Sequence, residues 1–271
     1  MTYQRVVSAL TIAGSDSGGG AGIQADLKTF AAHGVHGLSA IAALTAQNTR
    51  GVTAVHVPPL DFLKAQIDAC FDDFNVGAVK LGMLANAAVI HAVADALEHY
   101  RPAHVVLDPV MIATSGAKLL EDAALDALRA RLLPLATIIT PNLPEAELLC
   151  GHALGSTDDM HGAAKALRSQ MSQAVLLKGG HLPGTQDIVD VYCDASGTRE
   201  ILHPRLALEG HGTGCTLASA IAANLCLGMP LPIAVEAATD YIERALRGGY
   251  RPGRGDVVVL DHFGAALAAS R

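Results

Sequence analysis

The sequence predicts one α/β domain with a mostly parallel central sheet and helices on both faces of that sheet. Short apolar runs alternate with longer segments of helical periodicity along most of the chain, which is typical of strand–helix–strand units. Hydrophobic residues make up 51% of the sequence, so the chain can build a substantial core. Because no linker-like run and no repeat interrupts it, we expect a single domain over residues 1–271.

The N-terminal half begins with the apolar run Val6–Ala13. This run is short and leads into the glycine-rich loop Gly14–Gly22 rather than a small-residue cleavage site, so it indicates a buried strand and not a signal peptide. After this loop we expect a helix at 23–33, a strand at 38–46, a polar turn at 47–51, a β segment at 52–57, a helix at 60–74, a strand at 78–81, a helix at 86–99 and a strand at 105–107.

The C-terminal half continues this alternation and then changes pattern. We expect a helix at 123–132, a strand at 137–140, a helix at 162–172 and a strand at 174–177. The segments 188–193 and 200–206 lie on either side of a short turn, which predicts an antiparallel pair. An apolar helix at 216–227 and a last helix at 233–247 complete the predicted elements.

The segment Gly210-His211-Gly212-Thr213-Gly214-Cys215 is a glycine-rich turn that opens the helix at 216–227. Glycine allows the backbone to adopt positive φ and to approach a ligand closely. The first amides of a helix lack intrahelical partners and carry the positive end of the helix dipole, so Gly212–Cys215 predicts an anion-binding site. The same field favours a thiolate at Cys215, which we therefore expect to act as a base or nucleophile.

Polar side chains follow several of the predicted strands. Asp108 follows the strand at 105–107, Asn142 and Glu145 follow the strand at 137–140, and Lys178 follows the strand at 174–177. In an open parallel sheet, ligands bind beyond the carboxyl ends of the strands, so these side chains should share one site. Oxygen ligands suit Mg²⁺, and Lys178 can pair with nucleotide phosphates, which together favour phosphoryl transfer.

The chain lacks the signatures of several other protein classes. Gly14–Gly22 has neither G-x-G-x-x-G spacing nor the Gly-Lys-Ser/Thr of a Walker A loop, so we assign it to the acceptor side of the site. The net charge of −7 argues against nucleic acid as a partner. The five cysteines have no C-x-x-C spacing, which argues against a disulfide framework and favours the cytoplasm. No stretch approaches the ~20 apolar residues of a membrane span, so we expect no membrane partner.

Several motifs in register resemble those of the hydroxymethylpyrimidine/phosphomethylpyrimidine kinases of thiamine biosynthesis, within the ribokinase-like superfamily. They cover about residues 10–221. In chain order the matching segments are Leu10–Gly22, Gly22–Phe30, Ala46–Gly51, Lys80–Leu84, Val106–Met111, Thr140–Glu145, Leu177–His181 and His211–Thr216.

The resemblance implies a ribokinase-like three-layer fold and an ATP- and Mg²⁺-dependent kinase. Its reaction would be phosphorylation of 4-amino-5-hydroxymethyl-2-methylpyrimidine and then of the resulting monophosphate to the diphosphate. It also implies a cytoplasmic homodimer that acts on small molecules. Pyridoxal kinase, or an enzyme that accepts both substrates, is the alternative, because both compounds carry a hydroxymethyl group on a heteroaromatic ring. A ligand-binding protein without catalytic activity is a further alternative, but the charged site residues argue against it.

The resemblance also implies a role for each site residue. Gln47 would hydrogen-bond the aminopyrimidine, Asp26 and Gly14 would contact the substrate, and Met83 would pack on its ring. The implied ATP-binding residues are Lys178, Asp108, Asn142 and Glu145, with Asp108 and Glu145 also on the metal. Gly212, Thr213 and Gly214 would stabilise the transferred charge, and Cys215 would accept the hydroxymethyl proton. Segments 205–209 and 238–242 are candidates for the adenine pocket.

Overall fold

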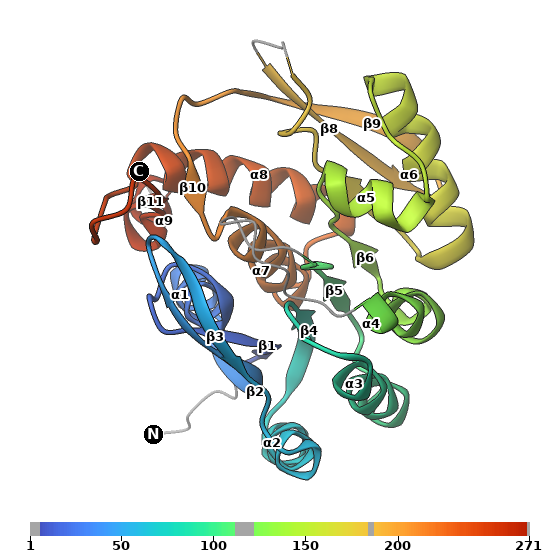
Figure 1. Ribbon diagram of the computed structural model, residues 1–271, viewed down its shortest axis with the longest axis vertical. Helices are drawn as coiled ribbons and strands as arrows, with labels where there is room; N and C mark the ends of the chain where they lie inside the picture. The colour runs from blue at the N-terminus through green and yellow to red at the C-terminus, as the bar shows by residue number, and fades with distance from the viewer. Residues whose placement is uncertain (1–5, 112–121, 184–186, 270–271) are drawn as a thin grey trace.

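A nine-stranded sheet forms the centre of the computed structural model, which describes residues 6–111, 122–183 and 187–269 (Figure 1). In order across the sheet, the strands are β3 (Gly51–His56), β2 (His36–Asn48), β1 (Ser8–Asp16), β4 (Val76–Leu81), β5 (Val105–Leu107), β6 (Ile138–Ile139), β7 (Val175–Leu177), β8 (Asp187–Asp194) and β9 (Gly197–Pro204). The pairings from β2 through to β7 are parallel. The pairings of β3, β8 and β9 at the two ends are antiparallel. The prediction of a mostly parallel sheet is confirmed.

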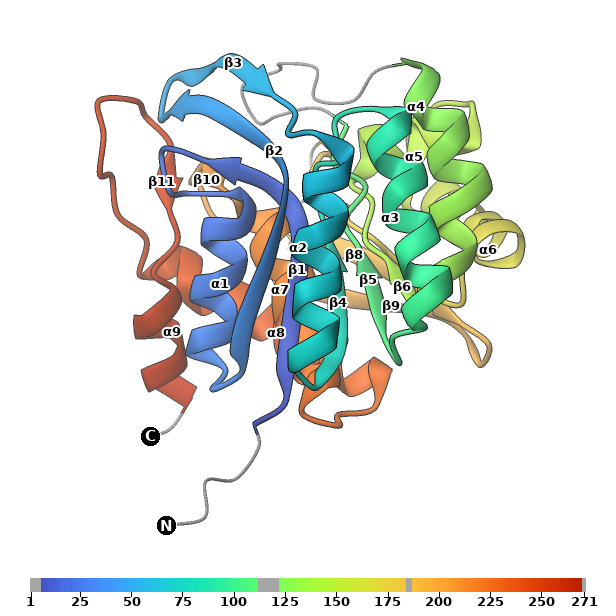
Figure 2. The same ribbon diagram turned by 90° about the horizontal axis from the view of Figure 1, so that it is seen from below.

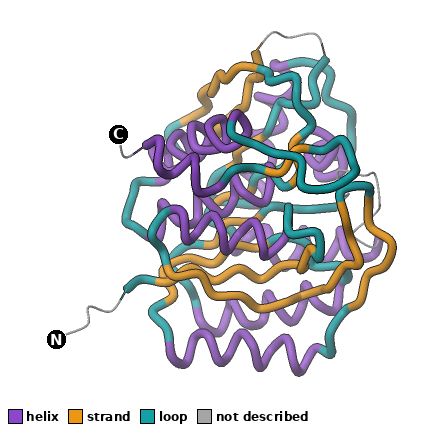
Figure 3. Tube along the Cα trace, turned by 90° about the vertical axis from the view of Figure 1, so that its left-hand side faces the viewer, coloured by secondary structure: helices purple, strands orange, loops and turns teal. Residues whose placement is uncertain are grey.

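Helices cover both faces of the sheet and complete three layers (Figure 3). One face packs against α2 (Leu60–Asp73), α3 (Ala87–Tyr100), α4 (Asp122–Ala127), α5 (Leu143–Cys150) and α6 (Thr157–Met171). The other face packs against α1 (Gly22–Ala32), α7 (Thr213–Cys226), α8 (Leu231–Arg247) and α9 (His262–Ala269). Among the helices described, none is long and apolar enough to span a membrane.

Each central strand is buried on both faces, which explains why the strands read as continuous apolar runs. In β5, Val106 belongs to the core beneath α7, whereas Val105 and Leu107 belong to the core beneath α3. Successive side chains of a strand point to opposite faces, so one run of three residues serves both cores. Polar functional groups are thereby confined to the ends of the strands.

A second, two-stranded sheet fixes the glycine-rich segment before α7. Here β10 (Gly210–His211) pairs in parallel with β11 (Val258–Val259), near the C-terminal end of the chain (Figure 2). The sequence analysis predicted neither β11 nor α9. Because β11 is only two residues long and α9 contains few polar residues, neither segment carries a clear periodic pattern.

Several predicted boundaries are corrected by the structure. Helix α5 was not predicted, because Pro141 and Pro144 made this segment look like a turn. The predicted helix at 123–132 is α4 followed by a π-helical segment at Leu128–Leu132. Helix α7 begins at Thr213 rather than at residue 216. Strand β2 continues to Asn48, so Gln47 lies in a strand and not in the predicted turn.

Candidate active site

A pocket of about 740 Å³ lies at the carboxyl ends of the central strands. It brings together residues far apart in the sequence, because the carboxyl ends of parallel strands meet at one edge of a sheet. All of the predicted site residues except Asp26 line this pocket. They are Gly14, Gln47, Met83, Asp108, Asn142, Glu145, Lys178, Gly212, Thr213, Gly214 and Cys215.

The N-terminus of α7 forms one wall of the pocket. Gly212 is its N-cap and has a left-handed φ of 84°, and a Cβ there would collide with the carbonyl oxygen of Gly20. The first backbone bond of the helix runs from Thr216 N to Gly212 O, 2.9 Å. The amides of residues 213–215 therefore precede the helical hydrogen-bond pattern, and the positive end of the helix dipole faces the pocket.

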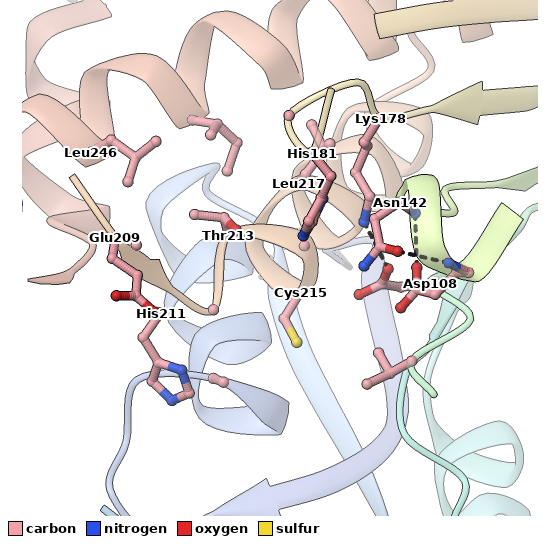
Figure 4. Close-up of a pocket in the computed structure, with 18 of the residues that line it drawn as sticks. Asp108, Asn142, Lys178, His181, Glu209, His211, Thr213, Cys215, Leu217 and Leu246 are labelled. Atoms are coloured by element: carbon pink, nitrogen blue, oxygen red, sulfur yellow. Dashed lines mark hydrogen bonds and ion pairs between the residues drawn. The ribbon is translucent and has the colours of Figure 1, made fainter. Parts of the chain in front are cut away.

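A charged cluster lies beside this helix end (Figure 4). The Nζ of Lys178 is 3.3 Å from Oδ1 of Asp108, and Thr140 Oγ1 donates to the same oxygen at 3.4 Å. Burial alone would lower the pKa of Lys178, but the carboxylates of Asp108 and Glu145 raise it, so the lysine stays charged. A Cβ at Gly214 would lie 3.2 Å from both Asp108 Oδ2 and Lys178 Nζ, so only glycine lets the helix approach without displacing this pair.

Asn142 and Glu145 have a structural role that sequence reasoning missed. They form a capping box at the start of α5: Glu145 N donates to Asn142 Oδ1 at 2.9 Å, and Asn142 N donates to Glu145 Oε2 at 2.8 Å. The Asn-x-x-Glu spacing was the signal that could have revealed both the cap and the helix. The cap holds these two side chains at the pocket wall.

Asp108 and Glu145 provide the donors that a divalent cation would need. Burial raises the pKa of Glu145 above its ordinary value, and although Lys178 opposes this shift, the negative charge of Asp108 adds to it. Two carboxylates in one buried site repel each other, and a cation between them would relieve that repulsion. No group of three or more His, Cys, Asp or Glu suited to a metal is found among the described residues. The pair nevertheless fits Mg²⁺, which uses one or two carboxylates together with phosphate and water oxygens.

Cys215 stands in the first turn of α7, between the charged cluster and His211 (Figure 4). Burial raises the pKa of its thiol to about 11, although Lys80 and a hydrogen bond from the Gly22 backbone act in the opposite direction. Burial thus opposes the thiolate that the field at the helix N-terminus favours at Cys215. Desolvation of the buried sulfur exceeds the favourable effect of the helix end.

The opposite wall of the pocket contains Gln47. Thr45 Oγ1 donates to Gln47 Oε1 at 3.0 Å, and Gln47 Nε2 lies 3.2 Å from Nε2 of His211. His211 contributes to this wall, but the sequence analysis gave it no role of its own. Met83 also lies here, and a Cβ at Gly14 would be 3.0 Å from the sulfur of Met83, so these two residues are packed against each other.

Asp16 links His211 to the glycine-rich loop. His211 Nε2 lies 3.1 Å from Asp16 Oδ2, and the backbone amides of Gly18 and Ala21 donate to the same carboxylate at 2.7 and 2.9 Å. Burial would raise the pKa of Asp16, but these hydrogen bonds lower it below its ordinary value, so the side chain is a carboxylate. Asp16 therefore fixes the loop and His211 relative to each other.

The structure corrects the role predicted for Asp26, which was contact with the substrate. It is fully buried in α1 and does not line the pocket. Its carboxylate accepts hydrogen bonds from Lys80 Nζ at 2.8 and 2.9 Å, from Thr11 at 2.6 Å and from Ser219 at 2.7 Å. Direct contact with a substrate is therefore not supported, since the carboxylate is enclosed by protein groups.

Both candidate segments for the adenine pocket reach this same cavity. Segment 205–209 and helix α8 contribute apolar and polar residues to the end of the pocket beyond Lys178 and Thr213. They include Leu206, Leu208, Thr239, Ile242 and Leu246. The apolar side chains of these two segments suit a flat ring, and the charged residues Arg205, Glu209 and Glu243 also line the pocket.

Comparisons with known proteins identify the family of this chain. The profile of the phosphomethylpyrimidine kinase family matches residues 16–260. The hydroxymethylpyrimidine/phosphomethylpyrimidine kinase of Rhizobium meliloti is 50% identical over 255 residues, which cover 92% of this chain and 95% of the relative. The thiamine biosynthesis bifunctional protein ThiED of Geobacter sulfurreducens is 49% identical over 249 residues; the match covers 92% of this chain but only 51% of that longer protein.

Solved structures of two related kinases have the same fold as this chain. The ADP complex of Bacillus subtilis pyridoxal kinase superposes with a TM-score of 0.89 at 35% identity, over 97% of this chain and 99% of that one. The phosphomethylpyrimidine kinase of Clostridium difficile superposes with a TM-score of 0.80 at 44% identity, over 88% and 99%. The sheet and its pocket thus define a ribokinase-like small-molecule kinase. More particularly, the chain belongs to the phosphomethylpyrimidine kinase family.

Proposed function

We propose that this protein uses ATP to phosphorylate 4-amino-5-hydroxymethyl-2-methylpyrimidine and then phosphorylates the monophosphate to the diphosphate. One observation carries the proposal: a single pocket contains an acceptor wall with Gln47 and Met83, the N-terminus of α7, and the Asp108–Lys178 cluster. Three relatives that are 46–50% identical and matched over 93–95% of their own length are hydroxymethylpyrimidine/phosphomethylpyrimidine kinases, which supports the same substrate class.

In this proposal the transferred phosphoryl group lies at the N-terminus of α7. Lys178 pairs with the nucleotide phosphates, and the amides of residues 213–215 stabilise the charge that develops during transfer. Asp108 and Glu145 would hold Mg²⁺, which when bound neutralises phosphate charge. The apolar residues of segment 205–209 and of α8 would hold the adenine ring.

Cys215 takes the proton in the first reaction. As the hydroxymethyl oxygen bonds to the γ-phosphorus, the bond from that phosphorus to the ADP oxygen breaks and the hydroxyl proton moves to the Cys215 thiolate, which becomes a thiol. In the second reaction the acceptor is a phosphate oxygen that is already negatively charged, so little deprotonation is needed. The proposal therefore assigns Cys215 mainly to the first reaction.

A coupled ATP-turnover assay with Mg²⁺ tests the function. It compares the pyrimidine, its monophosphate and pyridoxal as acceptors. We expect turnover of both pyrimidine compounds and weaker turnover of pyridoxal. No ATP turnover with any acceptor would contradict a catalytic role, and turnover of the free alcohols alone would remove the second reaction from the proposal.

Pyridoxal phosphorylation is the second candidate function. It is favoured by the high structural similarity to pyridoxal kinases, with a TM-score of 0.89 for the Bacillus subtilis enzyme. Gln47 argues for the pyrimidine, because an amide offers both a donor and an acceptor to the aminopyrimidine edge. A preference for pyridoxal in the same assay would make this candidate the main function and would leave Gln47 without its proposed role.

The rate of the first phosphorylation should rise with pH. Because burial raises the pKa of Cys215 to about 11, only a small fraction of the protein carries the thiolate at neutral pH. That fraction grows about tenfold with each pH unit below the pKa. We expect kcat for the free alcohol to rise about tenfold per unit between roughly pH 7 and pH 9, while kcat for the monophosphate changes less than about threefold. Parallel profiles for the two acceptors would exclude thiolate formation as the origin of the effect.

Replacing His211 by leucine should weaken binding of the pyrimidine without weakening binding of ATP. The Asp16 carboxylate can only accept a hydrogen bond, so His211 Nε2 donates to it at 3.1 Å. The substitution removes this hydrogen bond and the imidazole that lies 3.2 Å from Nε2 of Gln47. A lost hydrogen bond in a buried site costs about 1–2 kcal/mol, so we expect KM for the pyrimidine to rise on the order of tenfold. Steady-state kinetics with each substrate varied in turn provide the measurement. An equal rise in KM for ATP would mean that His211 shapes the whole pocket.

We further propose that the enzyme works as a cytoplasmic homodimer, as the family resemblance implies. Among the described strands, β3 lies at one end of the sheet and pairs with β2 alone, and Val55 on this strand is 44% exposed. An edge strand with exposed apolar residues suits pairing with a second copy. Light scattering coupled to size-exclusion chromatography tests this assembly, and a monomer at micromolar concentration would contradict it.

A further inference from the structure

A buried ion pair lies directly behind the reacting end of the pocket. Lys80 in β4 and Asp26 in α1 are both fully buried, and Lys80 Nζ donates to both Asp26 oxygens, at 2.8 and 2.9 Å. Thr11 and Ser219 complete the hydrogen bonding of the carboxylate. The lysine therefore cannot change position easily, since its partner is held by groups from β1 and α7.

Of the two residues of this pair, only the lysine lines the pocket. Lys80 lines the same pocket as Cys215, whereas Asp26 does not reach it. Ser219, which binds Asp26, follows Cys215 by one helical turn in α7. The hydrogen-bond network that holds Lys80 is thus tied to the helix that carries the cysteine.

Four charged side chains interact electrostatically with Cys215, namely those of Lys80, Asp26, Asp108 and Lys178. Burial raises the pKa of the thiol, Lys80 is the leading charge that lowers it, and Asp26 and Asp108 raise it. In the other direction, a negative charge on Cys215 helps to raise the pKa of Lys80 and of Lys178, although burial alone would lower both. Charges interact strongly in a buried site, so a fixed ammonium group has a large effect on a nearby sulfur.

We propose that Lys80, clamped by Asp26, is a positioning residue whose fixed positive charge stabilises the Cys215 thiolate. The inference rests on the proposed function, in which Cys215 accepts the proton of the first phosphorylation. It explains how a sulfur that is buried, and therefore disfavoured as a thiolate, can still act as a base. It also gives a role to the lysine of the Lys80–Leu84 segment, which the sequence analysis left without one.

If the Lys80–Asp26 pair had only a structural role, its loss would change the alkylation of the cysteines in a different way. Loss of either partner of a buried pair is strongly destabilising, because the other charge is left unpaired. Looser packing would expose the cysteines of α7 and speed their alkylation. Loss of a stabilising charge would instead slow the alkylation of Cys215 alone. The two roles of the pair therefore predict changes of opposite sign.

The test compares Asp26→Asn with the double variant Lys80→Met/Asp26→Asn. These proteins differ only at residue 80, and neither leaves Asp26 as an unpaired buried carboxylate. Asp26→Asn leaves the buried Lys80 without its carboxylate partner, so any general loosening of that variant has to be detected at a second cysteine of α7. Iodoacetamide alkylation at pH 8 is followed at each cysteine by peptide mass spectrometry. Cys226 is the internal reference, because it lies in the same helix and burial raises its pKa to about 11 as well.

We expect Cys215 to react about tenfold more slowly in the double variant than in Asp26→Asn, which corresponds to one pKa unit, with Cys226 unchanged. An unchanged or increased ratio of Cys215 to Cys226 reactivity would overturn the proposal. Should the double variant fail to fold, Lys80→Gln/Asp26→Asn repeats the comparison with a polar residue. Because alkylation needs no substrate, the result is independent of whether the pyrimidine is the true acceptor.

Steady-state kinetics of the same variants then test whether the charge of Lys80 affects the first phosphorylation. Relative to Asp26→Asn, the double variant should lose about tenfold in kcat for the free alcohol and less than about threefold for the monophosphate. Equal losses for both acceptors would mean that Lys80 supports the pocket as a whole rather than Cys215.

Discussion

Replacing Cys215 by alanine should slow phosphorylation of the free alcohol by about 10²–10⁴-fold, the usual contribution of a positioned general base. Phosphorylation of the monophosphate should fall less than about tenfold, because its attacking oxygen already carries negative charge. The substitution leaves the backbone amides of α7 in place, so binding of the phosphates should change little. Separate measurement of kcat for the two acceptors, at saturating ATP, gives the result.

Two further variants make this experiment specific. Cys226→Ala is the matched control, because Cys226 lies at the other end of α7 and its sulfur donates to the Ser8 carbonyl outside the pocket. It should leave both rates within about twofold, as expected for a side chain remote from the reaction. Cys215→Asp should retain part of the first activity, since a carboxylate can accept the same proton. Equal losses of kcat for the two acceptors in Cys215→Ala would contradict the proposal that Cys215 acts mainly in the first reaction.

The placement of the charged cluster was predictable from the sequence for a simple reason. Asp108 and Lys178 each follow an apolar run short enough to be a buried strand, and parallel strands end at the same edge of a sheet. Their proximity, 3.3 Å between Nζ and Oδ1, then follows from the topology alone. The same reasoning applies to the start of α7, because a glycine-rich turn before an apolar helix is a local signal.

Other features depend on contacts between distant parts of the chain, and no local pattern reports them. Asp26 shares a face of α1 with Ile23 and Phe30, where a lone carboxylate would not be expected, and only Lys80, 54 positions later, makes it a buried ion-pair partner. Gln47 meets His211 across 164 positions. The raised pKa of the Cys215 thiol could not be predicted for the same reason: the dipole of α7 is local, whereas the desolvation that raises this pKa comes from the whole fold.

Gly212→Ala should lower kcat for both acceptors by about 10²–10³-fold, which is the usual cost of losing oxyanion donors. The new Cβ would collide with the carbonyl oxygen of Gly20, and the left-handed φ of 84° would be strained as well. Relief of the collision must displace either the first turn of α7 or the acceptor loop. The amides that stabilise the transferred phosphoryl group serve both reactions, so both rates should fall together.

Gly228→Ala is the control variant, because it introduces the backbone strain of a positive φ without a steric collision. Gly228 follows the C-terminal end of the same helix, has the same φ of 84°, and has nothing within 4 Å of the position where a Cβ would be added. Alanine there costs about 1–2 kcal/mol of folding stability but should leave both rates within about twofold. If Gly212→Ala lowered only the first rate, the start of α7 would act mainly by orienting Cys215. If both variants lost activity alike, helix stability would govern the site, and the close approach of Gly212 to Gly20 would have no catalytic role.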